Sequence, residues 1–476
     1  MPCKFLLVAL AFLFSIADAA SAQTTQRLNH QPPDGAGIGF LLTDGTVLCQ
    51  GNGESDWYKL TPDNAGSYVN GTWARMANLP SGYVPDAFAS AVLADGRVVI
   101  TGGEYLNGAF TLTNLGAIYD PVANTWTNLP APAAWDYIGD SPSIVLPNGN
   151  FMVGNKLNKS MAILNPKTLT WTVLPGTGKA DFNAEEGWTL LPDGTVLTMD
   201  VKRAPHAERF SVTTRQWSSA GSTIVDLHSP SPFGCIQYGP NGSLCYYPPG
   251  EIGPAILRPD GTVFATGSNS STGSGAGHTA IFDTKTRKWT VGPDFPNGDN
   301  AGDSYAVLLP SGNVLVEGFV SSYEWDGVAL RQTLPTFGSL IMLPTGQVLV
   351  GGTEVYNPAG TYDAAWAPTI KSVPSSLSRG ATYKISGTQF NGLSQAAAFG
   401  DEFETATNYP LVRITNNDTG HVFYARTHDH STMGVATGSK IVSTNFEVPA
   451  TVEIGASTLE VVANGIPSIP VSVTVN

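Results

Sequence analysis

The chain has 476 residues, of which 24 are Lys or Arg and 38 are Asp or Glu, giving a formal net charge of −14 at pH 7. Only 13% of the residues are charged, whereas 42% are hydrophobic and 52 are glycine. This composition argues against a coiled coil, a collagen-like chain and a disordered chain. The shortage of cations argues against binding to nucleic acid or anionic membranes, so we expect a loop-rich, all-β protein.

Residues 1–22 have the three parts of a secretory signal peptide. Lys4 supplies the positive charge, residues 5–16 form an apolar run, and residues 20–22 (ASA) give a small-residue cleavage site. The apolar run is too short to cross a bilayer. We therefore expect an exported monomer, secreted or periplasmic, with no membrane span.

Three cysteines remain after the signal peptide. Cys235 and Cys245 flank a segment that contains glycine and proline, which indicates a short disulfide loop in an oxidising compartment. Cys49 ends an apolar strand, and we expect it to be a buried free thiol.

An internal repeat organises most of the chain. Seven times, an apolar strand runs into a tight turn and a second apolar strand, as in AVLADGRVVITGG and TLLPDGTVLTM. Asp-Gly and Asn-Gly favour two-residue hairpin turns because these turns need positive φ. The turn glycines are Gly45, Gly96, Gly149, Gly194, Gly261, Gly312 and Gly346.

Each of the first five turns is followed by another apolar segment and then by a tryptophan, namely Trp73, Trp126, Trp171, Trp217 and Trp289. Each unit therefore has four antiparallel strands, and seven such units predict a seven-bladed β-propeller over residues 23–366. Two stacked β-sandwiches are the alternative, but they lack such a regular series of turns. The pattern does not show which segment closes the ring.

Residues 367–476 have a different pattern. The hairpin turns end, and short alternating strands follow a segment rich in proline and serine. This length and pattern predict one immunoglobulin-like β-sandwich.

The TGG and VGG endings, followed by Tyr-Asp-Pro and Trp, resemble kelch repeats. The mature chain resembles the galactose oxidase and glyoxal oxidase family, which has a seven-bladed kelch propeller followed by an early-set immunoglobulin-like domain. The resemblance covers the DGRVVITGG-type repeats, the PTI junction at residues 368–370 and the segment RTHDHSTMGVATG at residues 426–438. It implies that the last segment places His428 or His430 in the central opening of the propeller.

Members of this family that oxidise alcohols or aldehydes use copper with two Tyr and two His ligands, one Tyr being cross-linked to a Cys. Counting back from the turn glycines, Ala36 and Ala87 stand at the positions of that Cys and the partner Tyr. Thr336 and Phe337 replace the Tyr-His pair. One remaining imidazole cannot hold copper tightly, so we expect no copper radical site. An oxidase-family member with a divergent metal site is an alternative.

The segments before the inner strands are acidic in six of the seven repeats, eight to eleven residues ahead of the turn glycine. The resemblance places these segments at the channel mouth. Their acids are Asp34, Asp86, Asp140, Glu185, Glu186, Glu251 and Asp303. The same loops carry aromatic residues, including Trp135, Tyr137, Trp188 and Tyr247.

Converging carboxylates can bind Ca²⁺, and neighbouring aromatic rings can hold a sugar or a cationic ligand. The simpler interpretation is that the acids cap turns. We expect a binding protein for a carbohydrate or another extracellular ligand, protein ligands included.

Two other functions stay open. One is a polysaccharide lyase or hydrolase that uses Asp140, Glu185, Glu186 or Asp303 together with His430 for acid–base chemistry. The other is a protein-interaction propeller. His428 and His430 flank Asp429, a spacing that can put two imidazoles on one side of an extended strand as a metal-ligand pair.

Overall fold

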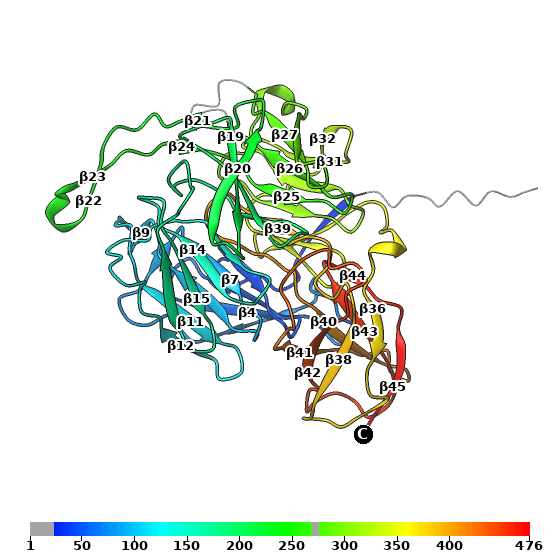
Figure 1. Ribbon diagram of the computed structural model, residues 1–476. Coiled ribbons are helices and arrows are strands. Elements are labelled where there is room, and N and C mark those ends of the chain that lie inside the picture. The colour runs from blue at the N-terminus through cyan, green and yellow to red at the C-terminus, as the bar shows by residue number, and fades with distance from the viewer. Residues whose placement is uncertain (1–22, 269–275) are drawn as a thin grey trace, which may run out of the picture.

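The computed structural model describes residues 23–268 and 276–476. The predicted signal peptide lies outside the described residues. Strands form nearly all of the regular structure, and seven antiparallel sheets, six of four strands and one of five, account for most of them (Figure 1). None of the described helices has the length and apolar character needed to cross a membrane.

Each of the seven sheets is one blade, and in blades 1 to 6 the four strands of the repeat follow in chain order from the channel outward. Blade 1 is β2 (Gly39–Leu41), β3 (Val47–Gln50), β4 (Trp57–Thr61) and β5 (Thr72–Arg75). Blade 2 is β7 (Ala89–Val92), β8 (Val98–Thr101), β11 (Gly116–Asp120) and β12 (Thr125–Asn128). Blade 3 is β13 (Ser143–Val145), β14 (Phe151–Gly154), β15 (Met161–Asn165) and β16 (Thr170–Leu174). Blade 4 is β17 (Thr189–Leu190), β18 (Val196–Met199), β19 (His206–Ser211) and β20 (Gln216–Ser222).

The remaining three blades follow the same pattern. Blade 5 is β25 (Ala255–Leu257), β26 (Thr262–Thr266), β27 (Thr279–Asp283) and β28 (Lys288–Val291). Blade 6 is β29 (Ala306–Leu308), β30 (Val314–Glu317), β31 (Ser322–Trp325) and β32 (Leu330–Gln332), preceded by η2 (Pro296–Gly298). Blade 7 is β33 (Leu340–Met342), β34 (Val348–Val350) and β35 (Glu354–Asn357), completed by β1 (Thr24–Arg27).

The N-terminal strand closes the ring. Strand β1 pairs antiparallel with β35, with Thr24 opposite Asn357 and Arg27 opposite Glu354. The inner strand of blade 7, β33, contacts β2 of blade 1, and β2 contacts β7 of blade 2. The sheets therefore form a closed seven-bladed β-propeller, and closure leaves few exposed inner edges.

The repeated residues explain the repeated geometry. All seven turn glycines have φ between 76° and 87°, the left-handed region that a two-residue hairpin turn needs. The fourth-strand tryptophans join neighbouring blades. The indole N–H of Trp126 donates to the carbonyl of Ala77 at 3.1 Å, and that of Trp289 donates to the carbonyl of Ala220 at 2.9 Å.

The C-terminal part is a β-sandwich at the lower right of Figure 1. Strand β41 pairs with β40 through its first half and with β42 through its second half, so it joins the two sheets of the sandwich. The remaining elements are η3 (Ala364–Trp366), β36 (Thr369–Ser372), β37 (Ser376–Leu377), β38 (Thr382–Thr388), β40 (Leu411–Asn416), β41 (Val422–His428), β42 (Val442–Glu447), β43 (Gly455–Ala463), β44 (Ile466–Pro467) and β45 (Val471–Val475).

One loop of the C-terminal part enters the propeller channel. We call residues 391–409, between β38 and β40, the plug. Its short strand β39 (Ala397–Ala398) pairs with β29 and adds a fifth strand to blade 6. The plug is also held by the amide of Leu190, which donates to Gln395 Oε1 at 2.7 Å, and by the amide of Phe403, which donates to the carbonyl of Phe88 at 3.0 Å.

The expected position of the two histidines is wrong. The amide of His430 donates to the carbonyl of Ala94 at 3.2 Å, beside the hairpin turn of blade 2. Hairpin turns lie at the ends of the inner strands, away from the segments that precede these strands. His428 and His430 therefore lie at the opposite end of the propeller from the acidic segments. The loop that fills the channel is the plug.

A long insertion precedes blade 5. It contains β21 (Ser229–Pro230) paired with β24 (Gly250–Glu251), and β22 (Ile236–Tyr238) paired with β23 (Leu244–Tyr246), with η1 (Pro240–Gly242) at the tip. Cys235 and Cys245 form a disulfide bond across this hairpin, while Cys49 is a buried free thiol. The hairpin projects at the left of Figure 1. A smaller three-stranded sheet before and within blade 2 consists of β6 (Pro85–Asp86), β9 (Tyr105–Leu106) and β10 (Ala109–Phe110).

Candidate functional site

A fully buried lysine lies at the centre of the acidic segments. Lys156 follows β14 of blade 3, and its side chain is inaccessible to solvent. Its Nζ forms ion pairs with Asp140 and with Glu185 Oε1, the latter at 2.7 Å, and lies 3.9 Å from Glu104 Oε1. Blades 2, 3 and 4 therefore each contribute one carboxylate to the same ammonium group.

Three of the acids occupy one repeated position. Asp140, Glu185 and Asp303 each lie nine residues before the turn glycine of their blade. Glu185 and Asp303 have φ of 58° and 48°, and Ala87, at the equivalent position of blade 2, has φ of 50°. Left-handed backbone at a non-glycine residue costs about 1–2 kcal/mol, and such residues cluster at functional sites.

The plug adds three further carboxyl groups, Asp401, Glu402 and Glu404, all less than a tenth exposed. Asp401 lies beside Glu185 and Asp140, and Glu402 lies beside Asp401. Within the described residues, Asp401 Oδ2 and both carboxylate oxygens of Glu404 have no hydrogen-bond partner.

The disulfide hairpin also reaches the cluster. The hydroxyl of Tyr246 donates to Glu185 Oε1 at 2.8 Å, and Lys156 Nζ lies 5.3 Å from the centre of the Tyr246 ring. Tyr246 stacks on Phe110, and Tyr238 packs edge-on against Tyr137. The hairpin is thus fixed over the cluster by one hydrogen bond and a set of aromatic contacts.

Burial and charge repulsion shift the titration of these groups. Burial raises the pKa of Asp140 well above its usual range despite the attraction of Lys156, because Glu104, Glu185 and Asp401 add repulsion. Burial acts in the same direction on Glu185, but Lys156 and the hydrogen bonds outweigh it and lower the pKa of Glu185. The ion pairs likewise raise the pKa of Lys156, which stays charged.

Two acids lie toward the solvent side of the cluster. Glu251 is half-buried, and Asp303 is exposed to water although protein atoms surround it, as expected at a channel mouth. Desolvation by these surrounding atoms is the main reason that the pKa of Asp303 is raised to about 6, and repulsion from Glu185 is the second. The carboxyl groups therefore form a series from the buried interior to the solvent.

The structure does not bring all the predicted residues together. Asp34 and Asp86 are exposed, and Asp86 Oδ1 accepts the amide of Ala87 at 2.9 Å, as the turn-capping interpretation expects. The placement of two aromatic residues at the mouth is wrong. Trp135 and Trp188 are buried, and Trp188 packs against Trp217 of the same blade. Tyr247 is 64% exposed on the disulfide hairpin.

Glu186 belongs to a second buried cluster, inside blade 4. Its two carboxylate oxygens contact Lys179 Nζ at 2.8 and 2.9 Å, and Glu208 Oε2 contacts the same ammonium at 2.8 Å. Asp200 completes this cluster and binds Nδ1 of His206 at 2.7 Å. Lys179 and its carboxylate partners are nearly inaccessible, so this network is internal to the blade and separate from the Lys156 cluster.

His428 and His430 point to different partners. His428 Nδ1 bonds Asp429 Oδ2 at 2.8 Å, whereas His430 Nδ1 bonds the hydroxyl of Thr444 at 2.8 Å. Burial lowers the pKa of His430 to about 3, so this imidazole is neutral at physiological pH. A shared metal at the two rings finds no support in these contacts.

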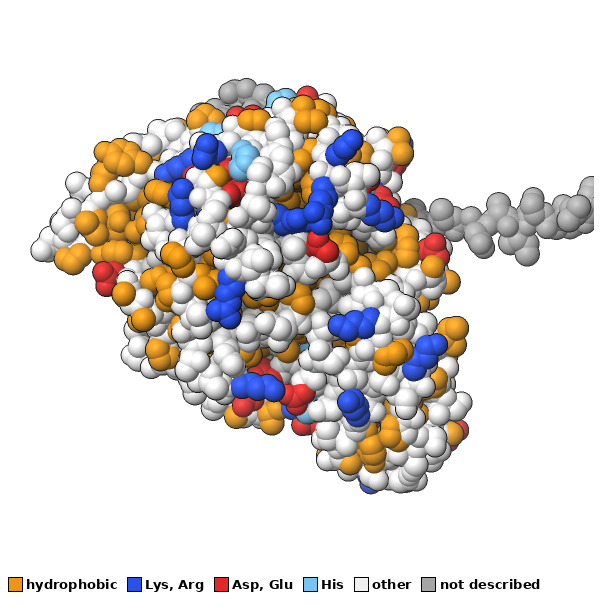
Figure 2. Space-filling model, in the orientation of Figure 1, with side chains coloured by type: hydrophobic (Ala, Val, Ile, Leu, Met, Phe, Trp, Pro, Cys, Tyr) orange, Lys and Arg blue, Asp and Glu red, His pale blue; other side chains and the backbone are white. Residues whose placement is uncertain are grey.

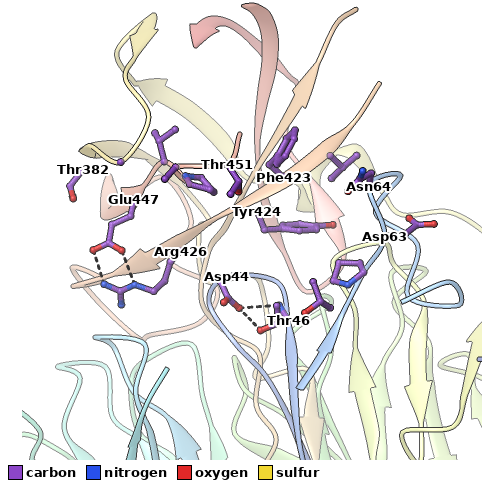
Figure 3. A pocket seen from close by; sticks show the side chains of 17 residues that line it. Asp44, Thr46, Asp63, Asn64, Thr382, Phe423, Tyr424, Arg426, Glu447 and Thr451 are labelled. Atoms are coloured by element: carbon purple, nitrogen blue, oxygen red, sulfur yellow. Dashed lines mark hydrogen bonds and ion pairs between the residues drawn. The ribbon is translucent and has the colours of Figure 1, made fainter. Parts of the chain in front are cut away.

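One cavity lies between the propeller and the sandwich, away from the acidic cluster. Its volume is about 680 Å³, and it separates the hairpin turn of blade 1 from strands β41 and β42 of the sandwich. Figure 3 shows Tyr424 across its centre, the Arg426–Glu447 ion pair on one wall and Asp44 bonded to Thr46 on another. None of the residues that line this cavity belongs to the carboxyl cluster.

Sequence reasoning missed Lys156 and the three plug acids. Lys156 is one of only 24 Lys and Arg residues, and it comes shortly after the second strand of its repeat. A rare basic residue at that position could have been singled out from the sequence. The GDEFE run at residues 400–404 is unusually acidic for this chain. Its position in the channel depends on how the loop between β38 and β40 packs, which the sequence pattern does not specify.

Comparisons with known proteins give only distant similarities. No family model matches the chain, and no curated protein matches it. Among solved structures, a fungal alcohol oxidase of the AA5 family in complex with copper has 13% identity and a TM-score of 0.48, covering 96% of this chain and 99% of that chain. A catalytically inactive virginiamycin B lyase from Staphylococcus aureus with quinupristin has 9% identity and a TM-score of 0.47, covering 70% and 98%. At these values the similarities do not indicate what this chain binds.

Glu317, at the end of β30, provides a pH-dependent prediction. Burial raises its pKa to about 7, although its carboxylate accepts amides of Gly338 and Tyr305. Between about pH 4.5 and pH 7 the folded state therefore binds a proton that the unfolded state does not, and stability falls as pH rises. We expect Glu317→Gln to be more stable than the wild type at pH 8 by about 1–3 kcal/mol, with little difference at pH 5.

Urea unfolding at both pH values measures this difference. The exposed Asp136→Asn, on the loop before blade 3, is the control, and its effect should not depend on pH in this way. Parallel pH profiles for Glu317→Gln and the wild type would show that Glu317 is ionised in the fold.

Proposed function

We propose that this chain is an exported kelch-type binding protein that holds a carbohydrate at the channel mouth and is not a copper radical oxidase. The observation that carries this proposal is the combination of water-accessible carboxylates with exposed aromatic rings on loops at one end of the propeller. Asp303 and Glu251 supply the carboxylates. The exposed rings are Tyr105, Phe182, Tyr247, Phe319 and Phe337.

This pairing matches the chemistry of a sugar. Carboxylates accept hydrogen bonds from hydroxyl groups, and flat rings cover the apolar faces of a pyranose. Figure 2 shows hydrophobic side chains gathered over the projecting hairpin at the left, where Phe233, Leu244 and Tyr247 are exposed. The disulfide of this hairpin supports export, because such bonds persist in oxidising compartments.

The burial of two candidate catalytic acids, Asp140 and Glu185, favours binding over catalysis. Asp140 and Glu185 are at most 5% exposed and are held by Lys156, so neither can reach a polysaccharide at the mouth. His430, the histidine of the lyase or hydrolase alternative, lies at the other end of the propeller. Among the acids of that alternative, only Asp303 faces solvent.

The residues at the family's copper positions support the non-oxidase part of the proposal. Ala36 packs toward Gly352, Ala87 has no ligating atom in its side chain, and Phe337 is 46% exposed. Thr336 is fully buried. None of these side chains supplies the nitrogen or phenolate ligands that copper prefers.

A glycan array followed by calorimetry tests this proposal. We expect one glycan class to bind, and Asp303→Asn and Phe337→Ala each to weaken binding about 5–30-fold. Ile469→Ala, at an exposed apolar residue of the sandwich, is the matched control and should bind normally.

Three results would overturn the proposal. Stoichiometric copper uptake with peroxide formation from an alcohol or aldehyde would make the chain an oxidase. Turnover of the bound polysaccharide would make it a lyase or hydrolase. Glycan-independent binding of an extracellular protein would make it an interaction propeller.

A further inference from the structure

Three carboxyl groups from two parts of the chain meet behind the channel mouth. Asp140 comes from the loop before blade 3, whereas Asp401 and Glu402 come from the plug. Each offers one carboxylate oxygen that lies within 4.8 Å of the other two. The three residues are 3%, 2% and 8% exposed, so the fold holds three carboxyl groups together with little water between them.

Two oxygens of this triad lack partners. Asp140 contacts Lys156 through Oδ2, but its buried Oδ1 accepts no hydrogen bond within the described residues. The same holds for Asp401 Oδ2. A buried carboxylate oxygen without a partner is costly, and native proteins usually pair such atoms with a donor or a bound ion.

Lys156 does not balance the surrounding charge. Lys156 lowers the pKa of Asp140, Asp401, Glu251 and Asp303, and the other charged groups that act most strongly on these four are carboxyl groups. Glu104, Glu185 and Glu402 add further carboxyl groups to the same region. A single ammonium therefore faces at least seven carboxyl groups, and a second positive charge would relieve their repulsion.

We propose that Asp140, Asp401 and Glu402 bind one Ca²⁺ ion, which links the plug to blade 3. All three donors are carboxylate oxygens, the ligands that hard divalent cations prefer. Ca²⁺ fits better than Mg²⁺ because it accepts irregular oxygen geometry, whereas Mg²⁺ requires a near-ideal octahedron. Glu402 is the most exposed of the three, at 8%.

This site goes beyond sugar binding, because its ligands lie behind the mouth and join two parts of the chain. The ion would hold the tip of the plug in the channel. Its effect should therefore include the stability of the propeller–sandwich assembly, independent of any ligand at the mouth.

Equilibrium dialysis of the EDTA-treated full chain against ⁴⁵Ca²⁺ tests this proposal. We expect one Ca²⁺ per chain with a dissociation constant of about 1 mM or tighter, and weaker binding of Mg²⁺. Asp401→Asn should weaken Ca²⁺ binding at least about tenfold and remove the rise in melting temperature that Ca²⁺ produces. Asp193→Asn, at a hairpin turn of blade 4, should leave both readouts unchanged.

The outcomes separate the alternatives. No stoichiometric binding by the folded wild type at about 10 mM Ca²⁺ would overturn the site and leave a shared proton as the balancing charge. Equal binding by the wild type and Asp401→Asn would place any calcium elsewhere. Neither result depends on the glycan screen, so failure of the calcium site and failure of the proposed function are distinguishable.

Discussion

Replacing Lys156 by methionine is expected to lower the free energy of unfolding by about 3–5 kcal/mol, measured by urea unfolding in EDTA. The substitution keeps most of the buried aliphatic volume but removes the ammonium that pairs with Asp140 and Glu185. These carboxylates would then remain buried beside Glu104 and Asp401 without a counter-charge. Breaking a buried ion pair by removing one partner carries a large penalty for this reason.

Two further variants test whether the loss of stability comes from the unpaired carboxylates. Lys285→Met removes an exposed lysine of blade 5 and should change the free energy of unfolding by less than about 0.5 kcal/mol. Adding Glu185→Gln to Lys156→Met should recover part of the loss, because it removes one of the unpaired charges. A Lys156→Met protein as stable as the wild type would mean that the neighbouring carboxyl groups are protonated in the fold.

The propeller could be predicted because its determinants are local and repeated. A positive-φ glycine defines each hairpin turn, and the spacing between turns defines the four-stranded unit. The tryptophans that mark fourth strands also bond the preceding blade, as Trp126 does with Ala77. The closing strand was not predictable from this pattern, because residues 24–27 form a single strand without the hairpin that identifies the other units.

The candidate site was predictable only where it follows the repeat. Counting from the turn glycine locates Asp140, Glu185 and Asp303, which occupy the same position in three blades. Trp135 and Trp188 come from the same loops but turn into the blade core, because sequence position does not give side-chain direction. Asp401 and Glu402 reach the site through a long loop of another domain, and such non-local packing has no local signature.

The difference between local sequence patterns and non-local packing also explains the error about His428 and His430. The segment at residues 426–438 resembles the family's channel loop, but here β41 and the residues after it lie against the hairpin turns of blades 2 and 3. The plug occupies the channel, and the carboxyl groups that it carries are Asp401, Glu402 and Glu404. The resemblance thus correctly anticipates the all-β architecture of a propeller followed by a sandwich, but not which loop of the C-terminal part enters the channel.

The second large effect concerns the contact between Gly187 and Gly400, at the tip of the plug. A Cβ atom added at Gly187 would lie 2.3 Å from the carbonyl oxygen of Gly400, which is backbone and cannot rotate away. We expect Gly187→Ala to displace the plug tip and to cost about 1–3 kcal/mol in the free energy of unfolding. Asp401, next to Gly400, would move with it, so Ca²⁺ affinity should fall at least about tenfold.

Gly400→Ala is the matched control, because it adds the same atom on the other side of the same contact. The nearest atom to its Cβ would be the carbonyl oxygen of Ile252 at 3.5 Å, an ordinary contact distance. We expect Gly400→Ala to unfold within about 0.5 kcal/mol of the wild type and to resist proteolysis at residues 391–409 equally well. Gly187→Ala should be cleaved there faster. If both variants behave alike, the tip of the plug does not rest on Gly187, and the carboxylates of blade 3 and the plug do not form one rigid cluster.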